Sequence, residues 1–483
     1  MKKLVFILIS LMFVVFSACK QEKKEEITSG VSATDSLPKV SDAMMENAVI
    51  YEANIRQYSP EGTFNAFTKD IKVLKDLGVK IIWVMPINPI SKIKRKATGD
   101  KFTSEITDEK EREKYLGSYY SVSDYKAVNP NYGTLEDFKN LVKTAHENGI
   151  YVILDWVPNH TGWDHPWITK HPDFYTHNDK GEIIDPIDPQ TGKSWGWTDT
   201  ADLNYDNPEM RKEMIKDMKY WIENADIDGF RMDVAHSVPV DFFNTAIAEM
   251  KKVKPVFMLA EAEKFELLKG NDAFDMQYGW EAHHIFNEIA NGKKNVKAFD
   301  NYMAKIDTVL EKDDIDMYFV TNHDENSWSG TLKERMPHNK EVFTALTYLM
   351  PGMPLIYSGQ EYDLDHRLKF FEKDSIPKKK GPYFELLKKL GELKNNDEAL
   401  NGGKQAASYK RIKTNNDEDM LAFERTKDGY QVLFVANLSK NPVQASIDYS
   451  GNFEDYLSGD TVSLDPTTTL QFEPWQYHIL IKK

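Results

Sequence analysis

Four acidic residues lie near or just after the carboxyl ends of short apolar segments: Asp155, Asp233, Glu261 and Asp324. Charged residues at the end of a strand usually point into a site rather than into a core. Four other polar residues accompany them: Asn159, His160, Arg231 and His323. Crowded carboxylates repel one another, and their removal from water is costly. If the fold brings these segment ends together, catalysis explains the set better than structure does.

Glycoside hydrolysis is the chemistry that fits such a set best. One carboxylate acts as the nucleophile and a second carboxylic acid, about 5–5.5 Å away in retaining enzymes, protonates the leaving oxygen. Arg231 lies two residues before Asp233, so on a strand both side chains share one face. A guanidinium at that place favours the ionised form of the nucleophile. Taken alone, this pair would fit a structural ion pair equally well.

Eight short apolar segments alternate with amphipathic stretches rich in Lys and Glu, which predicts strands separated by helices. The predicted strands cover residues 48–55, 79–86, 150–157, 227–234, 254–261, 273–279, 316–323 and 353–359. Eight nearly continuous apolar strands alternating with helices indicate a closed, parallel (β/α)8 barrel. Active sites of such barrels lie at the carboxyl ends of the strands. Closure would therefore place the four acidic residues on one rim.

Three segments depart from this alternation. Residues 161–208 contain four tryptophans and predict an excursion after the third strand, whose tryptophans either stack on a sugar or hold the excursion together. Residues 88–117 include the charged run DEKEREK, which predicts a solvated loop or helix, with a lid over the site as the alternative. The short strands and Asn/Asp/Gly turns of the last part predict an all-β sandwich. We therefore expect a barrel over residues 46–398 and a sandwich over 399–483.

The amino terminus resembles a bacterial lipoprotein signal. Two lysines precede an apolar run over residues 4–16, and Ser17 and Ala18 lead to Cys19. We expect residues 1–18 to be a signal peptide and Cys19 to be the lipidated first residue of the mature chain, with an ordinary signal peptide as the alternative. The polar residues 19–45 predict a flexible tether. The expected location is a membrane anchor on the periplasmic side or the cell surface.

The overall composition narrows the classes of partner. The 483 residues are 41% hydrophobic and 12% aromatic, which is typical of a globular protein. The formal net charge of −15 argues against nucleic acid as a partner, because a phosphate backbone needs a basic face. Cys19 is the one cysteine of the sequence, so no disulfide can form within the chain.

Four motifs occur in a fixed order along the predicted barrel. They are DWVPNH (155–160), GFRMDVAHS (229–237), LAEAE (259–263) and FVTNHDEN (319–326). Together they resemble the four ordered sequence regions of the α-amylase superfamily of glycoside hydrolases. GVKIIWVMPI (78–87) and PGMPLIYSGQE (351–361) extend the likeness. The resemblance implies a TIM barrel followed by a β-sandwich domain.

The resemblance also implies a role for each site residue. Asp233 resembles the nucleophile, Glu261, rather than Glu263, the general acid/base, and Asp324 the carboxylate that stabilises the transition state. The implied substrate-binding residues are Tyr120, Asp155, His160, Arg231 and His323. We expect His283 and His284, on a helix-like segment, to serve packing rather than metal binding.

Calcium is the one cofactor that the resemblance suggests. Asn159 and Asp202 match two calcium-ligand positions, and oxygen ligands suit this ion. Many relatives carry Lys-His after the nucleophile, where this chain has His236 and Ser237. The difference leaves both a calcium site and the balance between hydrolysis and glucosyl transfer open.

The sequence thus predicts a lipid-anchored, retaining glycoside hydrolase that cleaves α-1,4-glucosidic bonds in starch, glycogen or maltooligosaccharides. One alternative is a transglycosylase or an exo-acting α-glucosidase of the same fold. The other is a glucan-binding lipoprotein without catalysis, although such a protein would be expected to lack one of the three carboxylates.

Overall fold

The fold is described from a computed structural model, which covers residues 37–188 and 191–482. The predicted signal peptide, Cys19 and most of the predicted tether lie outside the described residues. The last part of the expected tether packs against the folded chain, because Val40, Met44 and Met45 are buried. The short helix α1 (Asp42–Met45) carries the two methionines. The ordered domain therefore already includes residue 40.

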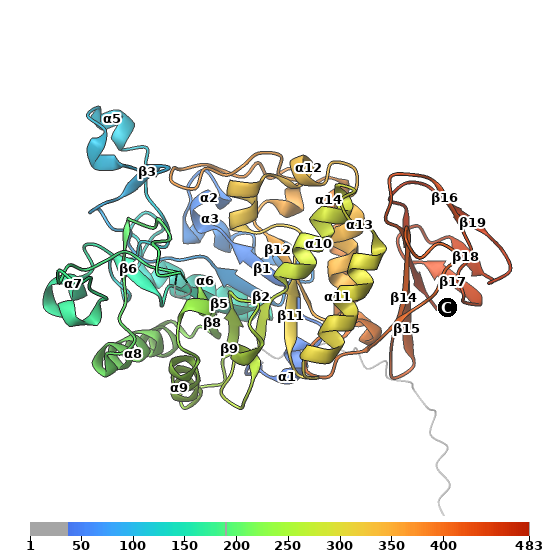
Figure 1. The fold of residues 1–483 in the computed structure, drawn as a ribbon, viewed down its shortest axis with the longest axis horizontal. Coiled ribbons are helices and arrows are strands. Elements are labelled where there is room, and N and C mark those ends of the chain that lie inside the picture. Colours follow the sequence, from blue (N-terminus) through green and yellow to red (C-terminus); the bar gives the residue numbers. More distant parts are fainter. Residues whose placement is uncertain (1–36, 189–190, 483) are drawn as a thin grey trace, which may run out of the picture. The chain divides into compact units, whose positions relative to one another are not determined.

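Eight parallel strands form a closed barrel, as the sequence predicts (Figure 1). They are β1 (Ile50–Ala53), β2 (Ile81–Val84), β5 (Tyr151–Trp156), β8 (Gly229–Met232), β9 (Phe257–Ala260), β10 (Met276–Tyr278), β11 (Ile315–Tyr318) and β12 (Met353–Tyr357). Each lies within or overlaps one predicted segment. The barrel closes where β1 pairs with β12, with Ile50 opposite Leu355.

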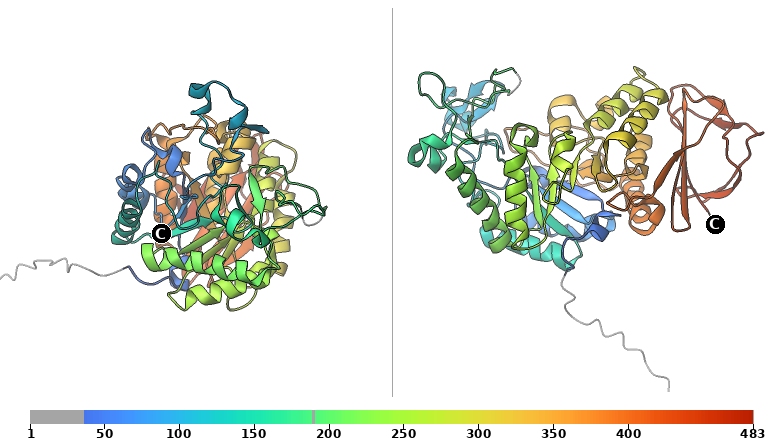
Figure 2. Two further views of the ribbon diagram at one scale, coloured as in Figure 1. Left: turned by 90° about the vertical axis from the view of Figure 1, so that its left-hand side faces the viewer. Right: turned by 60° about the horizontal axis from the view of Figure 1, so that its bottom comes forward.

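Helices surround the barrel strands (Figures 1 and 2). Those between β1 and β12 include α2 (Ile55–Tyr58), α3 (Phe64–Thr68), α4 (Ile71–Asp76), α6 (Leu135–Glu147), α8 (Pro208–Ala225), α9 (Val240–Lys251), α10 (Trp280–Ala290), α11 (Val296–Val309), α12 (Leu332–Arg335) and α13 (Lys340–Leu349). The helix α14 (Pro382–Asn396) follows β12. Polar caps begin several of them; the Thr134 side chain, for example, accepts a hydrogen bond from the Asp137 backbone at the start of α6.

Both faces of the barrel strands are largely apolar, because each face packs against a different core. Along β2, Ile81 and Trp83 belong to a cluster that also contains Ile153 and Leu259. The alternate residues Ile82 and Val84 belong to the larger cluster formed with the helices. Strand side chains alternate between faces, so the first set fills the barrel and the second packs under the helices. This double burial explains the continuous apolar runs in the sequence.

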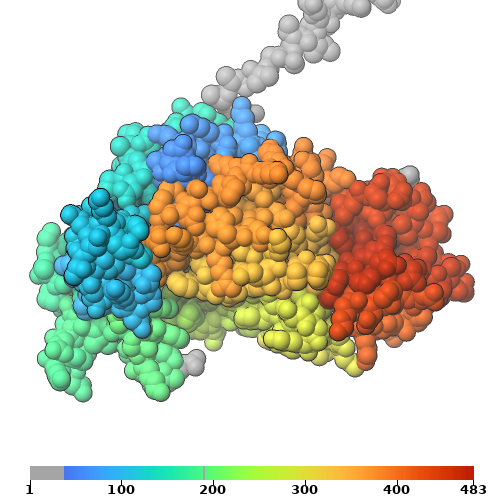
Figure 3. Space-filling model, turned by 90° about the horizontal axis from the view of Figure 1, so that it is seen from above, coloured from blue at the N-terminus to red at the C-terminus, as the bar shows by residue number. Residues whose placement is uncertain are grey.

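The two predicted departures from the barrel contain short elements. The excursion holds β6 (His160–Gly162), α7 (Pro166–Lys170) and β7 (Thr200–Asp202), with His160 opposite Asp202 in the β6–β7 pair. The insertion holds β3 (Lys96–Thr98), β4 (Lys101–Phe102) and α5 (Glu109–Arg112). No residue of α5 is buried. The charged run is therefore a solvated helix, in a lobe that projects from the surface (Figure 3).

An all-β region follows α14, as predicted. A six-stranded sheet is formed by β13 (Ser408–Arg411), β14 (Met420–Lys427), β15 (Tyr430–Asn437), β17 (Gly451–Asp455), β18 (Thr461–Leu464) and β20 (Tyr477–Ile481). The strands β16 (Val443–Ala445) and β19 (Leu470–Phe472) form a separate pair. Apolar side chains of both sheets share one buried cluster, which includes Leu433 and Phe472. Within the described residues, no helix is both long and apolar enough to cross a membrane.

Candidate active site

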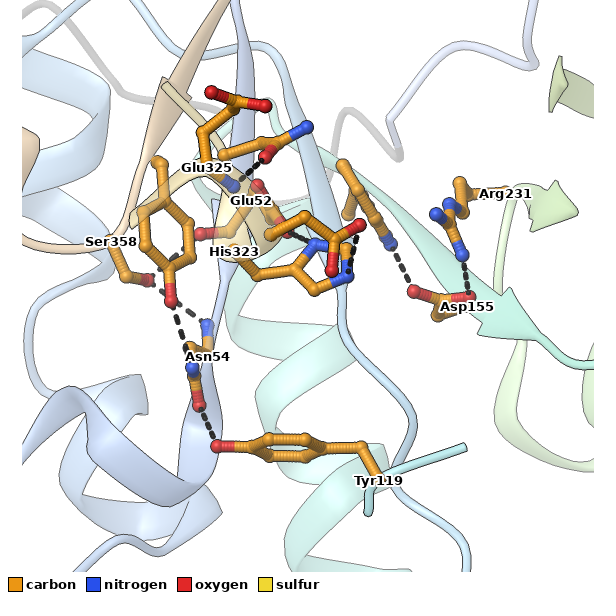
Figure 4. Close-up of polar contacts among 12 residues, drawn as sticks. Glu52, Asn54, Tyr119, Asp155, Arg231, His323, Glu325 and Ser358 are labelled. Atoms are coloured by element: carbon orange, nitrogen blue, oxygen red, sulfur yellow. Dashed lines mark hydrogen bonds and ion pairs between the residues drawn. The ribbon is translucent and has the colours of Figure 1, made fainter. Parts of the chain in front are cut away.

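One guanidinium joins three of the acidic residues that the sequence singled out. Arg231, on β8, is fully buried. Its Nη1 donates to Asp155 Oδ1 at 2.9 Å and to Asp233 Oδ1 at 2.8 Å. Its Nη2 lies 2.8 Å from Glu261 Oε1. Figure 4 shows Arg231 beside Asp155 at the end of β5. Residues from three neighbouring strands thus meet at a single cation, which is the convergence expected of barrel closure.

The fourth acid lies beside a histidine on the far side of the same rim. Asp324 Oδ2 is 3.4 Å from His323 Nε2, and the same nitrogen is 2.8 Å from the Tyr120 hydroxyl. The Tyr120 hydroxyl in turn donates to Asp155 Oδ2 at 3.2 Å. The rings of Tyr120 and His323 are stacked, and their centroids are 5.5 Å apart. These contacts connect the Asp324 side of the rim to the Arg231 side.

Burial and like charges favour the protonated forms of these acids. Burial raises the pKa of Asp233, the nearby Glu261 carboxylate raises it further, and Arg231 opposes both. Burial also raises the pKa of Asp155 to about 6, against the effect of Arg231. Of the groups around Asp233, Arg231 is the one that favours its ionised form, through both its charge and its hydrogen bond.

The two site histidines carry different charges near neutral pH. Burial lowers the pKa of His160 to about 3, so its ring is neutral. Burial also acts to lower the pKa of His323, but Asp324 and Glu52 outweigh it and raise the value to about 9. A neutral ring can accept one hydrogen bond and donate another, whereas an imidazolium only donates. The site therefore offers a substrate two chemically distinct imidazoles.

The backbone directly after Asp233 helps to hold the candidate acid. Val234 has a positive φ of 48°, which is unusual for a β-branched residue. In this conformation its N–H donates to Glu261 Oε2 at 2.7 Å. Glu261 is thus fixed at both carboxylate oxygens, one by Val234 and one by Arg231. Strained backbone of this kind gathers at functional sites.

A cavity of about 760 Å³ opens above these residues. Of the predicted residues, its lining includes Tyr120, His160, Asp233, Glu261, His323 and Asp324. Asp155 and Arg231 are not among the lining residues and lie fully buried. A cavity of this volume is typical of a site that binds small molecules.

Most of the other lining residues carried no clear signal in the sequence. Five of them are aromatic: Trp197, Trp280, Trp328, Phe370 and Phe371. Trp328 is 55% exposed, and its ring lies 5.1 Å from that of Phe370. The insertion contributes Lys96 and Asp100, so part of it borders the site although α5 does not. Trp197 belongs to the tryptophans of the excursion that the sequence singled out, whereas Trp328 was not predicted.

Several remaining sequence predictions find a definite place. His283 is buried, lies 3.2 Å from Glu325 Oε2 and stacks on Phe319, which agrees with a packing role. Glu263 lines the cavity and accepts a hydrogen bond from the Glu281 backbone. Among the excursion's tryptophans, Trp167 is buried whereas Trp195 is 41% exposed.

The two expected calcium ligands lie at the start of the excursion. The Asn159 carbonyl accepts a hydrogen bond from the Leu203 backbone, next to Asp202. Burial raises the pKa of Asp202 to about 6. However, no group of three or more His, Cys, Asp or Glu side chains in the described residues could hold a metal. Oxygen ligands suit calcium, but these two side chains supply only part of a shell.

Two carboxyls line the cavity of this barrel, and a guanidinium lies beneath them. This arrangement is typical of one class of enzymes, the glycoside hydrolases of (β/α)8 fold. The family model described as "Alpha amylase, catalytic domain" matches residues 41–429. The chain belongs to this family and is an enzyme of the glycoside hydrolase type.

Individual relatives agree with this assignment. The chain is 27% identical over 466 residues to "Alpha-amylase 3" of Dictyoglomus thermophilum, covering 82% of this chain and 85% of that one. It is 26% identical to a cyclomaltodextrin glucanotransferase of Geobacillus stearothermophilus, of which it spans 48%. In structure it resembles a maltogenic alpha-amylase from Thermotoga neapolitana, with a TM-score of 0.78, 26% identity, and coverage of 91% of this chain and 99% of that one.

Proposed function

We propose that this enzyme is a retaining hydrolase of α-1,4-glucans, acting on starch, glycogen or maltooligosaccharides. The observation that carries the proposal is the Arg231 guanidinium, which contacts Asp155, Asp233 and Glu261 beneath the cavity. Relatives named as amylases and a maltogenic amylase support the substrate class. The aromatic rings that line the cavity, of which Trp328 is the exposed one, suit the flat faces of glucose units.

The proposed reaction has two displacements. Asp233 attacks the anomeric carbon while Glu261 gives its proton to the glycosidic oxygen, so the leaving sugar departs as an alcohol. A glucosyl ester on Asp233 remains. Glu261, now ionised, then takes a proton from a water molecule that attacks the same carbon, and Asp233 is released. Asp324 is proposed to stabilise the positive charge that develops on the sugar.

Glucosyl transfer is the second candidate, because another sugar can replace water in the second step. The similarity to a cyclomaltodextrin glucanotransferase supports this alternative. His236 lines the cavity at a position where many relatives have lysine, so acceptor binding is the step in which this chain departs most from the family pattern.

A time course of products tests the proposal. Amylose, maltoheptaose and pullulan are incubated with a soluble form that starts after Cys19, and Asp233→Asn serves as the matched control. We expect short maltooligosaccharides from the native enzyme and none from the variant. Products longer than maltoheptaose would favour transfer. Full activity of the variant would refute the assignment of the nucleophile, and inertness toward all three glucans would refute the substrate class.

We also propose that Asn159 and Asp202 contribute to a calcium site completed by backbone carbonyls and water. If so, calcium raises the unfolding temperature of the chelator-treated protein. In Asp202→Asn, which removes the one carboxylate of the set, this increase is lost. An unfolding temperature that is the same in calcium and in chelator would overturn the site.

We further propose export and lipid anchoring through Cys19. Mass spectrometry of the membrane fraction tests this, because lipidation adds acyl chains to the peptide that begins at Cys19. A Cys19→Ala variant should leave the membrane fraction. An unmodified amino-terminal peptide from the native chain would refute the anchor.

A further inference from the structure

Glu52 is a fully buried carboxylate inside the barrel that no sequence motif singled out. It lies on β1, where it is opposite Trp83 on one side and Tyr357 on the other. Its Oε1 is 2.6 Å from His323 Nδ1, as Figure 4 shows. Its Oε2 is buried and has no hydrogen-bond partner among the described residues. A half-satisfied buried carboxylate is costly, so its one strong contact needs an explanation.

The hydrogen bonds around His323 determine which nitrogen atoms carry protons. Burial raises the pKa of Glu52, and the contact with His323 opposes this shift. When Glu52 is ionised it can only accept, so His323 Nδ1 is then the donor in their contact. On the other side of the ring, Nε2 is 2.8 Å from the Tyr120 hydroxyl. The single proton of that hydroxyl is directed to Asp155 Oδ2. With that proton on Asp155, Nε2 donates to the hydroxyl oxygen and also faces Asp324 Oδ2 at 3.4 Å, and a ring that donates from both nitrogens is an imidazolium.

We propose that Glu52 is a positioning residue that keeps His323 an imidazolium whose Nε2–H is directed at Tyr120 and Asp324 in the substrate cavity. This inference rests on the proposed function for its catalytic meaning. The charge of Glu52 offsets that of the imidazolium. The remaining carboxylates can then stabilise the positive charge of the transition state.

The other groups around His323 are consistent with this state. Besides Glu52, the charged groups that act on it include Asp324 and Asp155, which favour the imidazolium, and Arg231, which opposes it. Asp155 is reached through Tyr120. The ring of Trp83 meets the imidazole edge-on, 6.0 Å away, and adds no charge. Asp324 and Glu52 together raise the pKa of His323 to about 9.

Titration of His323 tests the inference directly. Protein labelled with ¹⁵N-histidine is followed by NMR from pH 5 to pH 10, and the His323 signals are assigned by their loss in His323→Asn. In Glu52→Gln, which removes the charge but keeps the shape, the midpoint of His323 should fall by about one to three pH units. In Glu52→Asp, which keeps a carboxylate, the midpoint of His323 should stay high. This variant also tests the inference if Glu52→Gln does not fold.

A second buried carboxylate next to β1 provides a matched control. Glu361 is also a fully buried carboxylate, but it contacts Tyr51 and the Gly359 backbone rather than His323. Glu361→Gln should leave the His323 midpoint unchanged. A midpoint that is unchanged in Glu52→Gln, or that moves equally in Glu361→Gln, would overturn the inference.

Kinetics then show whether the charge matters to turnover. With maltoheptaose, Glu52→Gln should lose kcat/KM as the pH rises from 6 to 8, by about tenfold more than the native enzyme does, because His323 now loses its proton in this range. A purely structural role for Glu52 would lower activity equally at all pH values. The NMR result does not depend on turnover. A high His323 midpoint in a protein that cleaves no glucan would refute the proposed function and leave the role of Glu52 intact.

Discussion

Arg231 and Arg425 are both fully buried arginines, yet their surroundings are opposite in kind. Arg231 contacts three carboxylates. Arg425, on β14, donates instead to backbone carbonyls, among them those of Leu349 and Asn401, each at 2.7 Å. The carboxylates raise the pKa of Arg231, whereas burial lowers that of Arg425 to about 10.

The difference shows how to tell a structural buried charge from a functional one. Carbonyl oxygens are neutral and fixed by the backbone. A cation among them therefore supplies hydrogen bonds to the ends of loops and helices and takes no part in chemistry. Buried Lys394 is a second example, because it donates to the carbonyls of Gly352 and Leu400. Carboxylates that share a cation can still act as nucleophiles or proton donors, which backbone carbonyls cannot do. The substitutions below test this distinction, beginning with the largest expected effect.

Arg231→Lys should reduce kcat by about 10²–10³-fold. A lysine ammonium is a single point charge and cannot present the planar fork that contacts Asp155, Asp233 and Glu261 together. Initial rates on maltoheptaose measure the effect. Circular dichroism should show a folded protein. A variant with native kcat would mean that the three carboxylates do not depend on the guanidinium geometry.

Arg425→Lys is the matched substitution at the structural site. It should lower the free energy of unfolding by about 3 kcal/mol, because several buried carbonyls lose their donor. At a temperature where the variant is folded, kcat/KM should be unchanged. Thermal unfolding and kinetics on the same sample separate the two effects. A large loss of kcat without a loss of stability would break the comparison between the two arginines.

The sequence predicts the barrel well because its strands are buried on both faces. Each of the eight predicted segments coincides with a strand of the closed barrel. The short elements of the insertion, such as β3, β4 and α5, were not predicted, since elements this short lack a readable period. The predicted tether extended too far, because Met44 and Met45 are only isolated apolar residues within a polar tract.

From residue types alone, the site was predictable where charged residues lie at or near strand ends, and the family resemblance added Tyr120. Asp233 and Glu261 are visible in this way, and the structure brings them to one guanidinium. Glu52 was missed because a single acid in the middle of a strand has no local signal; its partner His323 lies 271 positions away. Phe370 was missed because it belongs to an irregular loop that reaches the cavity only through the tertiary fold.

Asp316 extends the comparison to a buried acid among neutral donors. It accepts hydrogen bonds from Gln277 Nε2 and the Tyr302 hydroxyl, and burial raises its pKa to about 7. The folded state thus holds this proton up to pH 7, whereas the unfolded chain loses it near pH 4. Stability should therefore fall as the pH rises between these values, by up to about 1.4 kcal/mol per pH unit.

Asp316→Asn should remove this part of the pH dependence and leave kcat/KM unchanged, because the side chain is not among the residues that line the cavity. Urea unfolding at pH 5, 6 and 7 measures the slope. An equally steep slope in the variant would assign the pH dependence to other buried acids, and a loss of kcat would place Asp316 with Arg231 rather than with Arg425.

Lys96 combines features of the two kinds of buried charge, because it contacts both a carbonyl and a carboxylate. Its substitution should have the smallest effect. Its ammonium donates to the Gly196 carbonyl at 2.7 Å and lies 3.7 Å from Asp199 Oδ1. Both Lys96 and Asp199 line the cavity, next to the segment that carries Trp197. Without the ammonium, Asp199 would lose its cation and the Gly196 carbonyl would lose its hydrogen-bond donor, so this wall of the cavity would be less firmly held.

We therefore expect Lys96→Met to raise KM for maltoheptaose by about threefold, which corresponds to about 0.7 kcal/mol, with kcat within a factor of two. The substrate-binding wall is disturbed, but none of the contacts of Arg231 is. Lys101→Met, at an exposed position of β4, is the control and should leave KM unchanged. A tenfold fall in kcat would mean that the Lys96–Asp199 pair acts as the Arg231 cluster does. An unchanged KM with reduced stability would place it with Arg425, as a charge that only holds backbone in place.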